Sequence, residues 1–183
     1  MSLTLVIGPM FSGKSSYLLS SIRKYREIDW PIYIITSSLD NRYTQDAKIV
    51  NHDKESCNAD IAVNLLDNVS NEKKFLEAKV VIIEEGQFYP DLLPFVVKCV
   101  ESRKMHVIVA GLDGDAQRKP FGHLLDLIPY CDSIVKLKAY CKICNNGREA
   151  LFTSKKIHNN DVIDVGSSDK YEALCRTHYI EKN

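Results

Sequence analysis

The sequence has no excess of charge of either sign. Its 183 residues include 24 Lys plus Arg and 24 Asp plus Glu, so the formal net charge is zero. A protein that binds duplex nucleic acid normally carries a basic excess, because it must neutralise phosphates. The charge balance therefore argues against nucleic acid as the main partner.

Long apolar runs are also missing. Residues 1–4 show no basic segment followed by a signal-like apolar core, and the other apolar runs have the length of a β-strand. A membrane-spanning helix needs about 20 apolar residues. We expect a soluble, cytoplasmic protein without a membrane partner. Hydrophobic residues make up 45% of the chain, which suffices for one substantial domain with at most a small appendage.

A disulfide framework is not expected, because disulfides do not persist in a reducing compartment. The six cysteines are expected to be thiols or metal ligands. We interpret Cys57, Cys99 and Cys131 as buried, small apolar residues.

The first three-quarters of the chain alternates strand-like and helix-like segments. The predicted strands are 3–7, 32–35, 80–83, 107–110 and 134–137, and the predicted helices are 15–25 and 92–100. The strand at 80–83 shows no polar alternation, which is typical of a strand covered on both faces. This order predicts an α/β fold with a parallel sheet flanked by helices. The sequence does not give the strand order.

Two segments depart from this alternation. Residues 36–58 are polar, and we expect a long mobile excursion there. From residue 139 onward, short strand-like pieces are separated by turn signals and bracketed by cysteines. We therefore predict a main domain over residues 1–138 and a small second domain over residues 139–183.

A glycine-rich motif follows the first predicted strand and precedes the first helix. It consists of Gly8, Pro9, Met10, Phe11, Ser12, Gly13, Lys14 and Ser15, which matches G-x-x-x-x-G-K-[ST]. Glycines let backbone N–H groups approach phosphate oxygens, and the helix N-terminus adds positive potential. We expect Lys14 to reach the β- and γ-phosphates of ATP, and the Ser15 hydroxyl to hold Mg²⁺.

Two carboxylates follow the buried strand at 80–83. An acid at this place in P-loop enzymes helps to hold Mg²⁺. Adjacent residues of a strand point to opposite sides, so Glu84 and Glu85 need not share one task. We assign Glu84 to the metal side and Glu85 to the acceptor hydroxyl, from which it would take the proton.

Four residues of the C-terminal segment have metal-ligand spacing. Cys141 and Cys144 form a C-x-x-C knuckle, and Cys175 and His178 form a C-x-x-H knuckle. Together they make a closed Cys₃His set, the kind that holds structural Zn²⁺. His158 and His123 are the alternatives for the fourth ligand.

Three motifs beyond the phosphate motif complete a pattern. They are Glu84-Glu85-Gly86-Gln87-Phe88, Leu112-Asp113-Gly114, and Gln117-Arg118-Lys119-Pro120-Phe121-Gly122. With residues 166–171 and Cys175, they occur in the order found in thymidine kinases of the cellular and poxvirus type, and the chain resembles that zinc-containing family over nearly its whole length. The resemblance implies a P-loop NTPase-like fold with a C-terminal zinc-binding lid, or lasso.

The resemblance also implies site residues. Glu85 falls on the proton acceptor, and Gln87 and Arg118 fall on polar positions beside the phosphates. The positions that enclose the base are Met10, Phe88, Leu112, Phe121 and Tyr171, and the lid segment that binds the base edge is Val162, Ile163, Asp164, Val165 and Gly166. Arg42 is a further candidate for offsetting charge on the transferred group.

Two positions depart from the family pattern. Glu84 stands where the family usually has Asp, and we expect a retuned magnesium site. Ala116 stands where the family commonly has an aromatic residue stacked on the base, a contact of about 1–3 kcal/mol in single-strand binders. Its loss is expected to weaken thymidine binding or to widen the pocket.

The expected activity is transfer of the γ-phosphate of ATP to the 5′-hydroxyl of thymidine and deoxyuridine, giving dTMP for DNA synthesis by nucleotide salvage. The resemblance further implies a homotetramer and feedback inhibition by dTTP. Two alternatives remain open: a P-loop ATPase that acts on DNA through a zinc ribbon, and a zinc-ribbon binding module on a nucleotide-binding scaffold.

Overall fold

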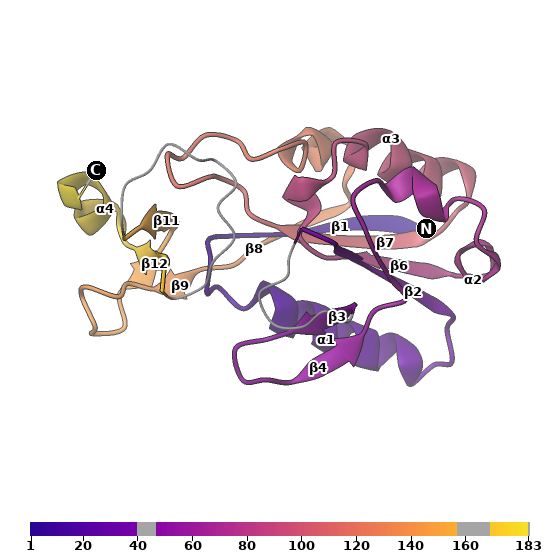
Figure 1. Cartoon of the computed structure of the whole chain (residues 1–183), viewed down its shortest axis with the longest axis horizontal. Helices are drawn as coiled ribbons and strands as arrows, with labels where there is room; N and C mark the ends of the chain where they lie inside the picture. The colour runs from indigo at the N-terminus through magenta and orange to yellow at the C-terminus, as the bar shows by residue number, and fades with distance from the viewer. Residues whose placement is uncertain (40–46, 157–168, 183) are drawn as a thin grey trace.

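A six-stranded parallel sheet forms the centre of the protein (Figure 1). The computed structural model describes residues 1–39, 47–156 and 169–182. In spatial order the strands are β5 (Ile61–Val63), β2 (Ile32–Ser37), β6 (Val80–Ile83), β7 (His106–Gly111), β1 (Ser2–Ile7) and β8 (Ser133–Lys136). All five pairings are parallel. The predicted fold class is therefore confirmed.

Alternating side chains of the strands build two cores, one on each face of the sheet. Leu5, Val81 and Val109 belong to the core that is covered by α3 (Leu92–Val97), a π-helical segment (Lys98–Ser102) and two 3-10 helices (Leu66–Val69 and Leu125–Tyr130). Val6 and Ile82 belong to the opposite core, which is covered by α1 (Lys14–Arg26). Figure 1 shows α3 and α1 on opposite sides of the sheet. Burial on both faces explains why these strands are apolar without alternation.

The predicted strands and helices of the sheet region are present with small shifts of their ends. The strand at 80–83 has the predicted bounds. The helix predicted at 92–100 is α helical only to Val97 and continues as the π-helical segment, which places Cys99 in the core with 1% of its surface exposed. Cys57 and Cys131 are only partly buried, so the prediction that all three cysteines are core residues is wrong for these two.

The predicted excursion at 36–58 is partly ordered, which corrects the sequence-based expectation. β3 (Lys48–Val50) and β4 (Ser56–Asn58) form an antiparallel hairpin. Ile49 is fully buried in the core beside α1, because that helix offers an apolar stripe that the sheet alone does not cover. The sequence analysis also missed the edge strand β5 and the short helix α2 (Lys73–Leu76). Residues 40–46 lie outside the described part of the chain.

Residues 139–156 and 169–182, called here the C-terminal unit, build their own small core. They form two antiparallel pairs, β9 (Ala139–Tyr140) with β10 (Glu149–Ala150) and β11 (Phe152–Lys155) with β12 (Tyr171–Leu174), followed by α4 (Arg176–Lys182). Their core contains Cys141, Cys175 and Tyr179, and Phe11 of the glycine-rich phosphate motif packs against it. The domain boundary at 138/139 stays a prediction.

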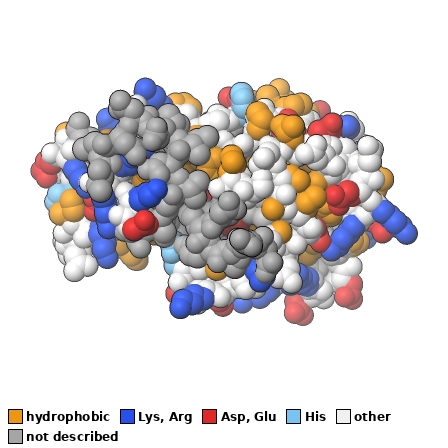
Figure 2. All heavy atoms as spheres, in the orientation of Figure 1, with side chains coloured by type: hydrophobic (Ala, Val, Ile, Leu, Met, Phe, Trp, Pro, Cys, Tyr) orange, Lys and Arg blue, Asp and Glu red, His pale blue; other side chains and the backbone are white. Residues whose placement is uncertain are grey.

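The surface carries mixed charge. On the face shown in Figure 2, basic and acidic side chains are interspersed over the described residues rather than gathered in one basic stripe. Within the described ranges, no helix combines the length and the apolar character that crossing a bilayer requires.

Candidate active site

The phosphate motif forms a loop at the carboxyl end of β1, called here the phosphate loop (residues 8–15). α1 begins at Lys14, and Gly13 caps it in the left-handed region with φ 85°. A Cβ at Gly8 would lie 2.5 Å from the Leu137 carbonyl oxygen and 2.9 Å from Ser12 Oγ. Only glycine fits there, because the backbone at Leu137, directly after β8, lies against it.

The polar groups of this loop match a phosphate ligand. Lys14 Nζ donates to the carbonyls of Gly8 at 3.2 Å and Pro9 at 2.8 Å, which holds the ammonium group over the loop. Among the described residues, the buried Ser12 hydroxyl has no hydrogen-bond partner. A buried hydroxyl without a partner is costly unless a ligand satisfies it. The loop therefore fits a bound nucleotide phosphate chain.

Ser15 and Glu84 meet across two neighbouring elements. The Ser15 hydroxyl donates to Glu84 Oε1 at 2.7 Å, and Glu84 is 7% exposed. A hydroxyl beside a carboxylate, both oxygen ligands, is the donor set that Mg²⁺ takes in P-loop enzymes. The residues present therefore fit a magnesium ion held between α1 and β6.

Glu85 is held by Gln87. Gln87 Nε2 donates to Glu85 Oε2 at 2.6 Å, while Gln87 Oε1 accepts the Leu112 N–H at 3.0 Å. Gln87 is buried, so these two bonds fix the orientation of its amide. The Glu85 carboxylate is thus oriented from the carboxyl ends of the neighbouring strands β6 and β7.

Three of the predicted site residues occupy the left-handed region of backbone space. Their φ angles are 65° for Phe11, 54° for Glu85 and 63° for Arg118. Such a conformation costs a non-glycine residue about 1–3 kcal/mol and persists where the surroundings enforce it. Such positions cluster at functional sites, although Asp29, Lys54, Lys104 and Asn145 share the conformation outside the proposed site.

The residues predicted to enclose the base lie on several segments. Phe88 and Phe121 pack edge to face with ring centroids 5.7 Å apart. Met10 and Tyr171 are buried, at 9% and 8% exposure. Leu112 is half-buried beside Gln87. The lid residues 162–166, Arg42 and His158 lie outside the described residues, so their assignments stay predictions.

Arg118 contacts the C-terminal unit. Its guanidinium carbon lies 4.7 Å from the ring centroid of Tyr179 and 5.6 Å from that of Phe152. The Tyr179 hydroxyl also donates to the carbonyl of Ala116 at 2.6 Å. The sequence analysis missed Tyr179, because nothing local in the sequence links it to a residue 63 positions away.

Thr153 is a second residue that sequence reasoning missed. Its Oγ1 accepts the N–H of Met10 at 3.0 Å, and this hydrogen bond is buried. The two residues are 143 positions apart. A Thr at an inward position of a short strand gives no signal that its hydroxyl bonds to the phosphate loop.

The four predicted metal ligands come together in the C-terminal unit. Their ligand atoms all lie within 4.8 Å of one another. Cys144 Sγ is 3.8 Å from Cys175 Sγ, and His178 Nδ1 is 3.3–3.5 Å from the three sulfurs. A zinc tetrahedron with ordinary bond lengths has S–S edges of about 3.8 Å and N–S edges of about 3.6 Å. The cluster therefore fits Zn²⁺ with His178 Nδ1 as the nitrogen ligand.

Two of the three thiols in the cluster, Cys141 and Cys175, have a lowered pKa, whereas burial raises the pKa of Cys144 and the hydrogen bond to Cys141 raises the pKa of His178. Burial raises the pKa of Cys141, but hydrogen bonds from the backbone at Cys144 and Cys175 and from His178 bring it down to about 6. A thiol with this pKa is largely a thiolate at neutral pH, the form that binds metal. His123, the alternative ligand, instead contacts Asp126 at 2.8 Å on the surface.

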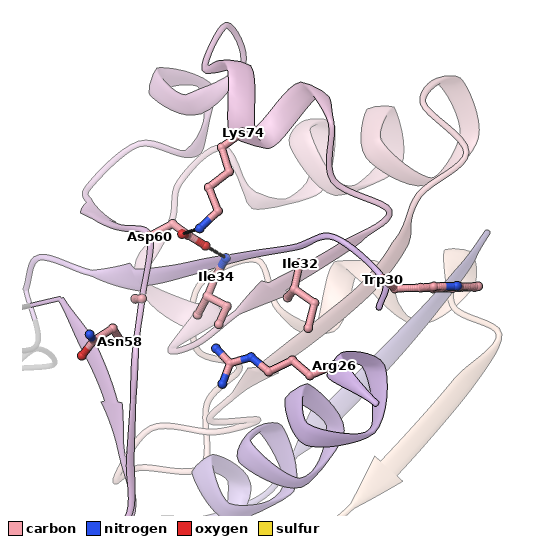
Figure 3. Close-up of a pocket in the computed structure, with 8 residues that line it drawn as sticks. Arg26, Trp30, Ile32, Ile34, Asn58, Asp60 and Lys74 are labelled. Atoms are coloured by element: carbon pink, nitrogen blue, oxygen red, sulfur yellow. Dashed lines mark hydrogen bonds and ion pairs between the residues drawn. The ribbon is translucent and has the colours of Figure 1, made fainter. Parts of the chain in front are cut away.

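A cavity of about 320 Å³ lies away from these groups (Figure 3). Arg26, Trp30 and Ile32 line it, and Lys74 points toward Asp60 (Figure 3). Ile32 is the first residue of β2, so the cavity lies at the amino ends of the strands. Ligands of open parallel sheets bind at the carboxyl ends. We do not assign this cavity to the active site.

Comparison with known proteins decides the family. A sequence model described as thymidine kinase matches residues 1–179. The chain belongs to the thymidine kinase family. It is 38% identical to human cytosolic thymidine kinase over 177 residues, which cover 97% of this chain and 72% of the human protein. It is 39% identical to the thymidine kinase of vaccinia virus (strain Western Reserve), with coverage of 97% and 96%. The Gallus gallus cytosolic thymidine kinase is 37% identical, with coverage of 97% and 76%.

Membership of the thymidine kinase family confirms the resemblance drawn from the motifs. It also gives the site a context, because a kinase needs a phosphate cradle beside a group that accepts a proton. In this thymidine kinase family member, the phosphate loop, the Ser15–Glu84 pair and the Glu85–Gln87 pair gather at the carboxyl ends of β1, β6 and β7.

Proposed function

We propose that this protein transfers the γ-phosphate of ATP to the 5′-hydroxyl of thymidine, with deoxyuridine as a second acceptor. The observation that carries the proposal is that a phosphate-binding group and a proton-accepting group lie together at one edge of the sheet. Lys14 and Ser15 stand at the phosphate loop, and Glu85 stands one residue beyond Glu84, the partner of Ser15. The phosphate loop suits the nucleotide, and Glu85 suits the acceptor hydroxyl.

The residues divide the work of phosphoryl transfer. Lys14 and the loop amides bind the terminal phosphates, and Ser15 with Glu84 would hold Mg²⁺, which neutralises phosphate charge when it is bound. Glu85 accepts the proton of the 5′-hydroxyl, while Gln87 holds its carboxylate in place. Arg118 offsets charge that develops on the transferred group. Such transfer depends on positioning and electrostatics rather than covalent catalysis.

The nucleoside would lie against Met10, Phe88, Leu112, Phe121 and Tyr171. Ala116 leaves this pocket without the aromatic stack expected in the family, so the pocket has more room than an aromatic residue would leave. We propose that residues 162–166 bind the base edge as a lid and that residues 139–183 form a zinc-binding domain. Cys141, Cys144, Cys175 and His178 would hold a structural Zn²⁺.

The family relationship supports three further proposals. We infer a homotetramer, feedback inhibition by dTTP and a cytoplasmic location, the last in agreement with the human and chicken relatives that are named cytosolic. Size-exclusion chromatography with light scattering tests the tetramer. Turnover measured against rising dTTP tests the inhibition.

The experiment for the proposed function is nucleoside-dependent release of ADP from ATP and Mg²⁺. Thymidine, deoxyuridine, deoxycytidine and deoxyguanosine are supplied separately. We expect release with thymidine and deoxyuridine. Release with deoxycytidine or deoxyguanosine as well means that Ala116 has broadened the pocket. Release that requires DNA instead of a nucleoside overturns the proposal in favour of a DNA-dependent ATPase.

A further inference from the structure

The C-terminal unit bonds to the backbone of both loops that are proposed to hold the substrates. Thr153 accepts the N–H of Met10 in the phosphate loop at 3.0 Å. Tyr179 donates to the carbonyl of Ala116 at 2.6 Å, within residues 112–122, called here the Ala116 loop. One small unit thus connects the nucleotide side of the site with the nucleoside side.

Thr153 and Tyr179, called here the two anchors, are both buried, each with 4% of its surface exposed. A buried backbone N–H such as that of Met10 needs a partner, and leaving it without one is costly. Both bonds end on backbone atoms, so they persist whatever side chain stands at residue 10 or 116. The position that departs from the family pattern, Ala116, therefore keeps its backbone anchored.

The anchors lie close to the metal cluster along the chain. Tyr179 follows the ligand His178 directly, and its N–H bonds to the carbonyl of the ligand Cys175 at 2.9 Å. Thr153 pairs with Ala173 in the β11–β12 ladder, two residues before Cys175. Fixing the four ligands around one ion would therefore also fix the backbone that carries both anchors.

Aromatic contacts connect the two anchors to each other. Phe152 precedes Thr153 on β11, and its ring centroid lies 5.1 Å from that of Tyr179. The guanidinium of Arg118 lies over the Tyr179 ring, which holds the Ala116 loop at a second point. The contacts run without interruption from Met10 through the C-terminal unit to Ala116.

We propose that Thr153 and Tyr179 are positioning residues through which the zinc-binding unit holds the phosphate loop and the Ala116 loop at a fixed separation. Neither touches the reacting atoms. Thr153 sets the position of the loop that binds ATP, and Tyr179 sets the position of the loop beside the nucleoside. The expected changes in KM rest on the proposed function, whereas the expected coupling between the zinc-binding unit and the two loops does not.

Hydrogen exchange tests the coupling without any assay of activity. Tyr179→Phe keeps the ring under Arg118 and removes only the hydroxyl. We expect amides of residues 112–122 to exchange about fivefold faster, the effect of losing one ordinary hydrogen bond. The matched control is Tyr140→Phe, because Tyr140 lies in the same unit with 74% of its surface exposed. This control should leave exchange in residues 112–122 unchanged.

Removal of zinc is the second test of this coupling. A chelator should raise exchange in both the phosphate loop and the Ala116 loop of the parent protein. After chelation, Tyr179→Phe and the parent should exchange alike in residues 112–122, because the anchor is already released. If chelation leaves both loops unchanged while peptides of the C-terminal unit exchange faster, the zinc cluster does not position them and the proposal is wrong.

Steady-state kinetics distinguish the two anchors. Thr153→Val should raise KM for ATP about fivefold with KM for thymidine nearly constant, and Thr153→Ser should restore it because it keeps the hydroxyl. Tyr179→Phe should raise KM for thymidine instead. If Val and Ser at position 153 behave alike, Thr153 does not act through its hydroxyl. If Thr153→Val does not fold, Tyr179→Phe and its exchange data still decide the coupling. Altered exchange without thymidine turnover leaves the coupling intact and overturns only the proposed function.

Discussion

Substitution of Gly122 tests how tightly the acceptor side of the site is built. Gly122 has φ +57°, and a Cβ there would overlap the carbonyl oxygen of Gln87 and lie 3.0 Å from its carbonyl carbon. Gln87 is the residue that holds Glu85. Gly122→Ala must therefore displace the backbone of Gln87, and with it Glu85, the proposed proton acceptor.

The expected magnitude follows from two costs. The left-handed backbone costs an alanine about 1–2 kcal/mol, and the forced displacement adds about 1–3 kcal/mol. For a chain of this size, 1 kcal/mol lowers the melting temperature by about 2–4 °C. We expect a decrease of roughly 4–20 °C. A shift of about 1 Å in the Glu85 carboxylate lowers turnover by up to about 100-fold.

Gly147→Ala is the matched control. Gly147 has φ +82°, but nothing lies within 4 Å of a Cβ built there. This variant carries only the backbone cost, so its melting temperature should fall by roughly 2–8 °C. Its turnover should stay near that of the parent. Thermal melts and thymidine turnover are measured for both variants. Equal losses in the two would refute the close approach of Gly122 to Gln87.

Three further predictions follow from individual contacts. Burial raises the pKa of Cys99 to about 12, so mass spectrometry after brief alkylation of the folded protein should find Cys57 modified well before Cys99; equal labelling would contradict this. Burial and the N-terminal amine lower the pKa of His106 below its ordinary 6.5, so the unfolded state binds a proton at higher pH. The contribution of His106 to the free energy of unfolding is therefore complete above about pH 6.5 and falls below it. Midpoints of urea unfolding at pH 7.5 and 5.5 should differ less in His106→Gln than in the parent protein. Ser15→Ala removes the bond to Glu84 and should raise the Mg²⁺ concentration needed for half-maximal turnover; an unchanged magnesium titration would remove Ser15 from the metal site.

Local sequence patterns predicted much of the sheet region. The strand at 80–83 could be read from its apolar run, and the phosphate loop from its glycines and the elements on either side. The edge strand at 61–63 was missed because three residues inside a polar region give no periodicity. The hairpin that buries Ile49 was missed because its stability comes from packing on α1 rather than from its own sequence.

The candidate site divides in the same way. The metal ligands were predicted because C-x-x-C and C-x-x-H spacing reflects local turn geometry, and the structure brings all four residues together. The Gln87–Leu112 and Ser15–Glu84 contacts depend on how the strands are ordered in the sheet, and strand order was not readable. Thr153 depends on a contact across 143 residues. A single sequence contains no local signal for such a contact.

The most direct test of the proposed mechanism is Glu85→Gln. Glutamine keeps the size of the side chain and can still bond to Gln87, but it cannot accept the proton of the 5′-hydroxyl. We predict that kcat for thymidine falls by about 10²–10⁴-fold, while the Kd for ATP stays within about twofold because the phosphate loop is unchanged. Glu101→Gln, a surface substitution with the same change of charge, should leave both values unaltered. Turnover of Glu85→Gln near that of the parent would contradict the assignment of Glu85 as the base.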